Sequence, residues 1–203
     1  MQLLPYSIET FLFGEQKVEL VVPDNNELKN RFQQNTNQPF PYWAKVWEAS
    51  VALSEFICEH EAVFKNKSVV ELAAGLGLAS LVASKFAKHI VCSDYAEEAL
   101  QYINLSIQQN QFTNISTQLI DWNFFGDAEI EEDIILMSDV NYHPENFNSL
   151  FNCFQKIIHQ NKTIILATPQ RITAKPFIEK LSPFIKQQFA KNIQQTSISI
   201  FIL

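Results

Sequence analysis

The run VVELAAGLGLAS, residues 69–80, holds two of the chain's four glycines, Gly75 and Gly77, after an acidic residue, Glu71. An apolar run that leads through glycines into a helical pattern is typical of a strand that turns sharply into a helix. Because glycine has no Cβ, a ligand could approach the backbone of this turn and the start of the next helix. Ligands of open α/β sheets bind beyond the carboxyl ends of the strands. The run therefore predicts a strand, a turn and a helix beside a ligand site.

Short apolar runs and helical patterns alternate along the rest of the chain. Further apolar runs occupy residues 89–94, 115–120, 133–138 and 163–168, and helical patterns occupy residues 46–57, 78–86, 100–107 and 147–158. Runs that are apolar on both faces and lie between helices are what a parallel sheet covered on both sides requires, so the fold class is α/β, doubly wound.

The C-terminal part of the chain is less regular. Residues 196–203, TSISIFIL, alternate in polarity and predict a last strand at or near an edge of the sheet. Pro176 and Pro183 interrupt the pattern of residues 173–195. The division of that segment between helix and strand is therefore not assigned.

The length of 203 residues and the hydrophobic content of 47% suit one substantial core. We expect a main domain over residues 39–203 and a small N-terminal appendage over residues 1–38. In the appendage, residues 8–13 and 17–22 are β-prone runs that flank GEQ and predict a hairpin. The Asn- and Gln-rich residues 25–38 predict a helix fragment or a loop.

Charge and composition exclude several classes of protein. The net charge of -7 argues against a general nucleic-acid binder, whose surface would be basic. No window approaches 18 apolar residues, and the N-terminal residues lack a basic segment followed by an apolar one, so neither a membrane span nor a secretory signal is indicated. The three cysteines and four histidines lack the spacing of metal ligands, so no metal site is expected. These features favour a cytoplasmic protein.

Two nucleotide-type ligands suit the glycine turn, NAD and S-adenosylmethionine. Glu71 precedes the turn, where an acid favours a cation over a pyrophosphate, and Ser80 stands at the third position of the G-x-G-x-x-G fingerprint of dinucleotide sites. The chain is also too short for the second domain that would carry the substrate of a dehydrogenase. These details favour S-adenosylmethionine.

Polar and aromatic residues follow the next two predicted strands. Asp94 closes the second strand, 17 residues after Gly77, where an acid can accept hydrogen bonds from two ribose hydroxyls. It could equally be a helix cap. Asp121 and Trp122 follow the third strand and would offer adenine a polar group and an apolar face; a core tryptophan beside a loop aspartate is the alternative.

The fourth predicted strand ends in SDVNYHP, residues 138–144. A carboxylate buried at a strand end is costly unless it has a partner, so Asp139 could bind an incoming amine, with Tyr142 shaping the pocket. A turn aspartate beside a core tyrosine is the alternative. Upstream, Trp47 could face a sulfonium, although an aromatic cluster is more often core. After the fifth strand, Arg171 could meet an acidic substrate or face solvent.

With these positions identified, the chain resembles the class I, seven-strand methyltransferases that depend on S-adenosylmethionine, and among them the protein-lysine methyltransferase family also labelled nicotinamide N-methyltransferase-like. The motifs that carry the resemblance are PYWAKVWEASVALSEFI, VVELAAGLGLAS, VCSDY, LIDWN and DIILMSDVNY, and they span about residues 39–172. PYWAKVW is similar to the branch that methylates the electron-transfer flavoprotein β subunit.

The resemblance implies a Rossmann-like sheet of seven strands, mostly parallel, with an antiparallel C-terminal strand. It also implies a cofactor site in which Glu71, Ala73, Gly75 and Asp94 line the methionine and ribose, Trp122 the adenine and Trp47 the flank; Gly77 and Asp121 complete our candidate set. Asp139, which also belongs to that set, and Tyr142 are the candidate catalytic residues beside the acceptor. Ala73 replaces the first glycine of the family's E-x-G-x-G-x-G turn.

We therefore expect an N-methyltransferase that modifies a lysine of a protein and releases S-adenosylhomocysteine. Two alternatives remain open: a small-molecule N-methyltransferase with an amine acceptor such as nicotinamide, and a cofactor-binding module without turnover. No metal is needed for in-line transfer between sulfur and nitrogen. We expect a monomer that binds neither nucleic acid nor membrane.

Overall fold

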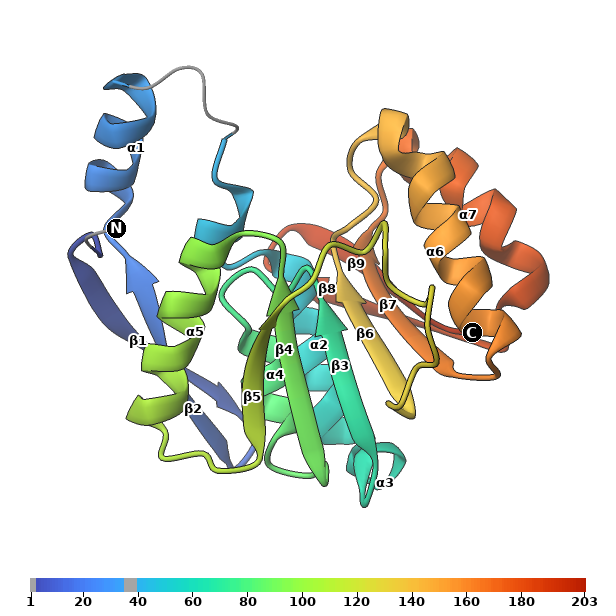
Figure 1. Ribbon diagram of the computed structural model, residues 1–203, viewed down its shortest axis with the longest axis horizontal. Helices are drawn as coiled ribbons and strands as arrows, with labels where there is room; N and C mark the ends of the chain where they lie inside the picture. Colours follow the sequence, from blue (N-terminus) through green and yellow to red (C-terminus); the bar gives the residue numbers. More distant parts are fainter. Residues whose placement is uncertain (1–2, 35–39) are drawn as a thin grey trace.

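The computed structural model describes residues 3–34 and 40–203, and its centre is a seven-stranded sheet (Figure 1). The order of the strands is β5-β4-β3-β6-β7-β9-β8. Their bounds are β3 Ser68–Leu72, β4 His89–Asp94, β5 Ile115–Leu119, β6 Ile134–Ser138, β7 Thr163–Pro169, β8 Gln187–Ile193 and β9 Thr196–Ile202. The first five run parallel, and β9 pairs antiparallel with both β7 and β8. The predicted doubly wound sheet of seven strands, mostly parallel with an antiparallel C-terminal strand, is confirmed.

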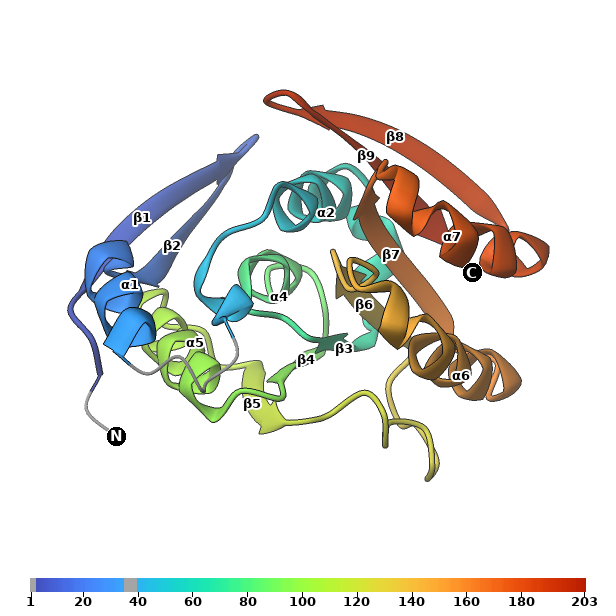
Figure 2. The same ribbon diagram turned by 90° about the horizontal axis from the view of Figure 1, so that it is seen from above.

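Helices cover both faces of the sheet, as the apolar runs require (Figure 2). On one face lie α2 (Glu48–Glu59), α4 (Leu78–Ala83) and α5 (Glu97–Gln109); on the other lie α6 (Phe147–His159) and α7 (Lys175–Leu181). Successive residues of β3 enter different cores: Val69 packs with the α2–α4–α5 side, and Val70 packs with the α6–α7 side. Both side chains are fully buried because neither face of the central strands meets water.

The unassigned C-terminal segment contains α7 and then β8. Pro176 stands in the first turn of α7, where its missing N–H costs no helical hydrogen bond, and Pro183 lies in a short 3-10 helix, Ser182–Phe184. β9 is the next-to-last strand of the sheet, so the prediction of a strand near an edge is confirmed. The outermost strand is β8, whose alternating exposure suits an edge.

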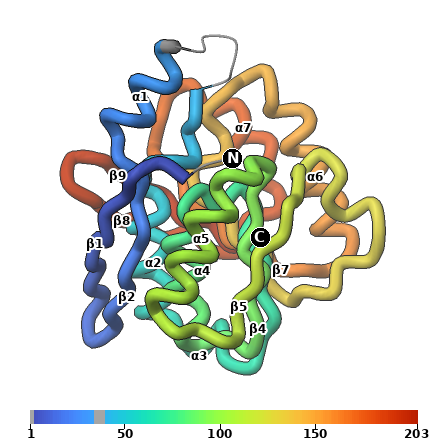
Figure 3. Tube along the Cα trace, turned by 60° about the vertical axis from the view of Figure 1, so that its left-hand side comes forward, coloured from blue at the N-terminus to red at the C-terminus, as the bar shows by residue number. Residues whose placement is uncertain are grey.

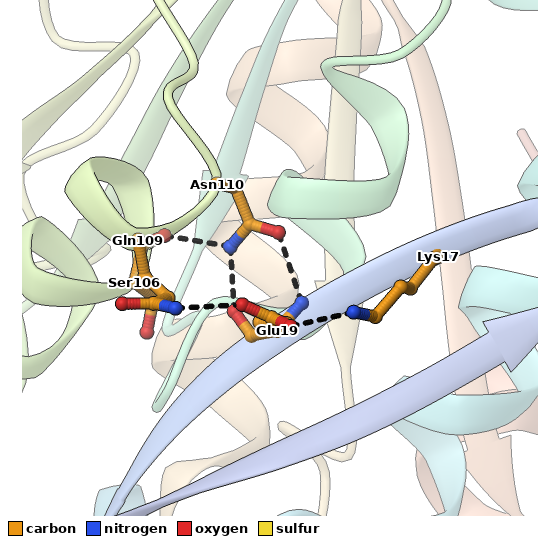
Figure 4. A network of polar contacts seen from close by, with 5 residues as sticks. All are labelled: Lys17, Glu19, Ser106, Gln109 and Asn110. Atoms are coloured by element: carbon orange, nitrogen blue, oxygen red, sulfur yellow. Dashed lines mark hydrogen bonds and ion pairs between the residues drawn. The ribbon is translucent and has the colours of Figure 1, made fainter.

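The N-terminal hairpin consists of β1 (Tyr6–Phe13) and β2 (Gln16–Pro23), as predicted. Its second strand lies along α5 (Figure 3). Side chains of α5 and of its C-cap residue, Asn110, form hydrogen bonds with the backbone of β2 at its free edge (Figure 4). The backbone N–H groups of Glu19 and Val21 donate to Asn110 Oδ1 and Ser106 Oγ, each at 2.9 Å. Since the β2 side chains Val18 and Leu20 are fully buried, the hairpin is part of the main core. The division into appendage and domain stays a prediction.

A helix follows the hairpin. Helix α1 (Asn25–Gln34) begins beside Asp24, whose Oδ1 accepts the backbone N–H groups of Asn26 and Glu27 at 2.8 and 3.0 Å. Arg31 in its last turn pairs with Glu98 of α5. The rest of the predicted helix-or-loop segment, from residue 35 to 38, lies outside the described residues. Within residues 3–34 and 40–203, no helix has both the length and the apolar character that a membrane span needs.

Candidate functional site

A hollow opens at the carboxyl ends of β3, β4 and β6, which we call the strand-end hollow. The segment that leads into α2 contributes Tyr42, Trp43, Lys45, Val46 and Trp47 to its wall. Eight predicted site residues line it: Trp47, Ala73, Gly75, Gly77, Asp94, Trp122, Asp139 and Tyr142. Glu71 and Asp121 are not in its wall. Tyr95 is in the wall and was not predicted, although its place directly after Asp94 could have indicated it.

The glycine turn has three residues in the left-handed region. Ala73 has φ +54°, Gly75 +60° and Gly77 +78°. A Cβ on Gly75 would lie 3.1 Å from the backbone oxygen of Trp43, and one on Gly77 would lie 2.8 Å from Cys92 Sγ. The two glycines therefore permit the turn and close packing of the protein against itself. Both residues also line the hollow, and the expectation that their missing Cβ atoms let a ligand approach the backbone stays a prediction.

Ala73 carries a Cβ in a conformation that disfavours one. The left-handed region costs a residue with a Cβ about 1–2 kcal/mol, and the added freedom of glycine in the unfolded chain offsets about 0.4–1 kcal/mol. We expect Ala73→Gly to raise the free energy of unfolding by about 0.5–1 kcal/mol, measured by urea denaturation. Ala74→Gly is the matched control, since Ala74 is outside the left-handed set. Equal destabilisation by both substitutions would contradict the assignment of strain to Ala73.

Asp94 ties the turn to β4. Its Oδ2 accepts the Gly75 N–H and its Oδ1 accepts the Ala96 N–H, both at 2.9 Å. Burial raises the pKa of Asp94, and these backbone hydrogen bonds oppose that rise. A carboxylate oxygen can accept more than one hydrogen bond, and Asp94 lines the strand-end hollow. The position allows both predicted roles, a helix-start cap and an acceptor for hydroxyl groups.

Glu71 lies beneath the turn with no exposed surface. Its Oε2 accepts the backbone N–H of Ser80 at 2.9 Å and the Ser80 hydroxyl at 2.6 Å. Its Oε1 has no hydrogen-bond partner among the described residues. Burial raises the pKa of Glu71 to about 7, and the nearby Asp94 adds to this rise. Ser80, which stands at the third glycine position of the dinucleotide fingerprint, therefore holds this carboxyl group in place through two hydrogen bonds.

The raised pKa makes stability depend on pH. Because the folded pKa of Glu71, about 7, exceeds its ordinary 4.5, the stabilisation is fully present below about pH 4.5 and is lost as pH rises through 7. We expect this group to contribute about 2–3 kcal/mol more stability at pH 5 than at pH 8. Glu71→Gln, which keeps the neutral shape, should remove that difference. Chemical denaturation at several pH values measures it, with exposed Glu129→Gln as control. An unchanged pH dependence in Glu71→Gln would contradict the prediction.

The end of β5 presents Trp122 to the strand-end hollow. Asp121 stabilises the turn in which it lies, because its Oδ1 accepts the backbone N–H of Asn123 at 2.9 Å and the Asn123 side-chain amide at 2.8 Å. Both residues line an adjoining hollow together with Tyr95 and Tyr142. Trp122 thus lies where a flat ring could stack on it, and Asp121 lies beside that place.

The end of β6 presents Asp139, which already has a cationic partner. Its two carboxylate oxygens bind both terminal nitrogens of Arg171, and Nη2 lies 2.8 Å from Oδ2. Arg171, for which the sequence left open an acidic substrate or solvent, therefore pairs with an acid of its own chain, and 35% of its side chain is exposed to solvent. Parallel pairing of Ser138 with Ala167 brings the ends of β6 and β7 together, which places the two side chains within reach of each other. Asp139 also has a left-handed φ of +53°.

Three aromatic rings in the wall of the strand-end hollow lie close to one another. The Tyr142 ring lies 5.3 Å from that of Tyr42, which lies 6.3 Å from that of Trp47. Burial raises the pKa of Tyr142 to about 12, so its hydroxyl stays protonated near neutral pH. The Lys45 ammonium lies 4.4 Å from the Trp47 ring centroid, so one face of this indole already holds a cation.

Three polar residues near this strand end make contacts within the protein. Asn141 is fully buried, and its Oδ1 accepts the Thr168 hydroxyl at 2.7 Å. Thr168 is 2% exposed and does not line the strand-end hollow. Gln170 donates to Ser199 Oγ at 3.1 Å. These contacts fix the neighbouring ends of β6, β7 and β9 around Asp139.

Comparisons with known proteins agree on a family. Residues 22–188 match the model of a family described as lysine methyltransferase. The human histone-arginine methyltransferase METTL23 is 27% identical over 60% of this chain and 66% of its own length. An electron transfer flavoprotein β subunit lysine methyltransferase homolog of Caenorhabditis elegans is 27% identical over 75% of this chain and 70% of its own. The matched part of the chain spans about half to two thirds of the length of the first curated relatives that it matches.

Solved structures share the fold at lower sequence identity. Magnesium protoporphyrin IX methyltransferase from Synechocystis, a structure with bound S-adenosylmethionine, has a TM-score of 0.63 and 11% identity over 87% of this chain and 94% of that chain. Identity this low reports the fold alone. The architecture is thus a Rossmann-like methyltransferase fold.

Proposed function

The chain belongs to the lysine methyltransferase family, and we propose that it transfers a methyl group from S-adenosylmethionine to the side-chain nitrogen of a lysine in a protein. One observation carries this proposal. The strand-end hollow brings the candidate cofactor residues Asp94 and Trp122 and the candidate acceptor residues Asp139 and Tyr142 to one wall.

The residues of the strand-end hollow fit this cofactor. Asp94 offers both carboxylate oxygens to hydroxyl groups, and Trp122 offers a flat apolar face. Beneath them, Glu71 holds a buried oxygen without a partner among the described residues, which suits a cationic ligand above the turn. When bound, S-adenosylmethionine supplies a methyl group on a sulfonium sulfur, and transfer to an amine nitrogen yields S-adenosylhomocysteine.

The acceptor side positions the amine. A lysine has an ordinary pKa of about 10.4, so it must lose a proton before its nitrogen lone pair can form the new bond. Tyr142 is itself protonated near neutral pH and cannot take that proton, so its role is to orient the amine. Asp139 draws the ammonium to the site, and water at the open mouth removes the proton. Positioning of this kind lowers a barrier by about 7–11 kcal/mol in favourable cases.

The test is incubation with methyl-labelled S-adenosylmethionine and a cell lysate, followed by separation of proteins from small metabolites. We expect label in a discrete protein band, and mass spectrometry of that band should find methyl-lysine. Asp139→Asn should remove the label, whereas Asp127→Asn, which changes an exposed aspartate outside the hollow, should retain it. Label confined to small molecules would support the metabolite enzyme, and cofactor binding without any label would support the module without turnover.

An arginine acceptor is a second candidate, because one contact favours it. The carboxylate of Asp139 already binds a guanidinium through both terminal nitrogens of Arg171. This geometry is the one in which carboxylates recognise arginine. Methyl-arginine in the labelled band would select this candidate over lysine.

A further inference from the structure

The ion pair between Asp139 and Arg171 connects two hollows. The Asp139 side chain is 6% exposed and belongs to the wall of the strand-end hollow. The Arg171 side chain is 35% exposed and lines a second hollow, which we call the Arg171 hollow. The pair therefore joins a nearly buried anion at the acceptor site to a cation that reaches solvent.

The Arg171 hollow contains a second anion. Glu48, the first residue of α2, lines it and acts electrostatically on Arg171. No Lys, Arg or His of the described residues lies within 4.0 Å of the Glu48 carboxylate. Because Arg171 has a long flexible side chain, it has a second carboxylate available on its solvent side.

The two carboxylates differ in how much they need a partner. A nearly buried anion such as Asp139 is costly without a partner, whereas the partly exposed Glu48 is hydrated when unpaired. In the absence of an acceptor, Arg171 therefore pairs with Asp139 rather than with Glu48. An ammonium that enters the strand-end hollow can replace Arg171 as the partner of Asp139. Arg171 can then move to Glu48, so that both Asp139 and Arg171 still have a partner of opposite charge.

We propose that Arg171 is an internal cation that occupies the acceptor carboxylate Asp139 at rest and moves to Glu48 when an acceptor ammonium displaces it. This inference rests on the proposed function, because it takes Asp139 as the acceptor-side anion. Arg171 is then a positioning residue that sets the affinity for the acceptor: only a cation able to compete with a bidentate guanidinium engages the site.

The test is equilibrium binding of n-butylammonium, a lysine side-chain mimic, to the full chain with saturating S-adenosylhomocysteine, followed by tryptophan fluorescence. Trp47 and Trp122 lie in the wall of the strand-end hollow and provide the signal. We expect Arg171→Met to lower the Kd for n-butylammonium at least fivefold. Asp139→Asn should abolish binding in both backgrounds, and the neutral isostere 1-butanol should not distinguish Arg171→Met from wild type.

The Glu48→Gln variant tests the second position of Arg171. It should raise the Kd at least twofold in the presence of Arg171 and leave the Kd unchanged in the Arg171→Met background. This double-mutant cycle separates a coupled pair from two independent effects. Circular dichroism and S-adenosylhomocysteine affinity show that each variant is folded.

Each outcome decides the inference. Tighter n-butylammonium binding in Arg171→Met supports displacement; equal or weaker binding, or no binding in either protein, overturns it. An effect of Glu48→Gln that persists without Arg171 overturns the movement to Glu48. Failure of the proposed function differs from these results, since it would show as no S-adenosylhomocysteine binding or no protein label in the lysate.

Discussion

Methyl transfer is expected to fall at least about a hundredfold when Asp139 is replaced by asparagine, while S-adenosylhomocysteine binding changes less than about twofold. Asparagine keeps the shape of the side chain and tolerates the left-handed φ of +53°, so the strand end should remain folded. The variant loses the charge that attracts the acceptor ammonium and holds Arg171. Single-turnover transfer to the labelled protein and calorimetric titration with S-adenosylhomocysteine measure the two quantities.

The matched control is Asp127→Asn, because Asp127 is an exposed aspartate in an ion pair with Lys156 outside the strand-end hollow. It should transfer at the wild-type rate. If folded Asp139→Asn lost cofactor binding together with transfer, Asp139 would belong to the cofactor side. If it retained full transfer, the acceptor carboxylate would lie elsewhere.

The sheet could be predicted from the sequence because its signal is local. Val69 and Val70 are both buried on opposite faces, so a continuous apolar run marks a central strand. The segment from residue 173 to 195 lacked such a signal. In a sequence pattern a proline such as Pro176 indicates the interruption of a helix, but in the structure it stands in the first turn of α7, where proline is favoured. Strand β8 is a half-exposed edge strand with few apolar residues, so it gives no continuous apolar run.

The candidate site could be predicted in part, because residues at strand ends gather at one edge of a parallel sheet. Pairwise contacts could not be predicted in the same way. Arg171 follows β7 and Asp139 follows β6, so their pairing depends on the strand order and on a side-chain rotamer. The need for glycine at position 77 likewise depends on the close approach of Cys92 of β4, and only the fold brings these two residues together.

Gly77→Ala should be the most destabilising of the substitutions considered, with a loss of about 2–5 kcal/mol in the free energy of unfolding. Two effects combine. The φ of +78° disfavours any residue with a Cβ, and the new atom would lie 2.8 Å from Cys92 Sγ and 3.3 Å from Ile103 Cγ1. Since domains are stable by about 5–15 kcal/mol, the variant is expected to be marginal at 37 °C. Urea denaturation at 15 °C measures the loss.

Gly14→Ala separates the two effects, because Gly14 has a similar φ of +59° and no atom within 4 Å of an added Cβ. It should cost only about 1 kcal/mol, the backbone part alone. Cys92→Ala removes the sulfur that the new methyl group meets, so Gly77→Ala should cost less in that background than in the wild type. Equal losses for Gly14→Ala and Gly77→Ala would show that backbone conformation, and not the contact between the glycine turn and β4, selects glycine at position 77.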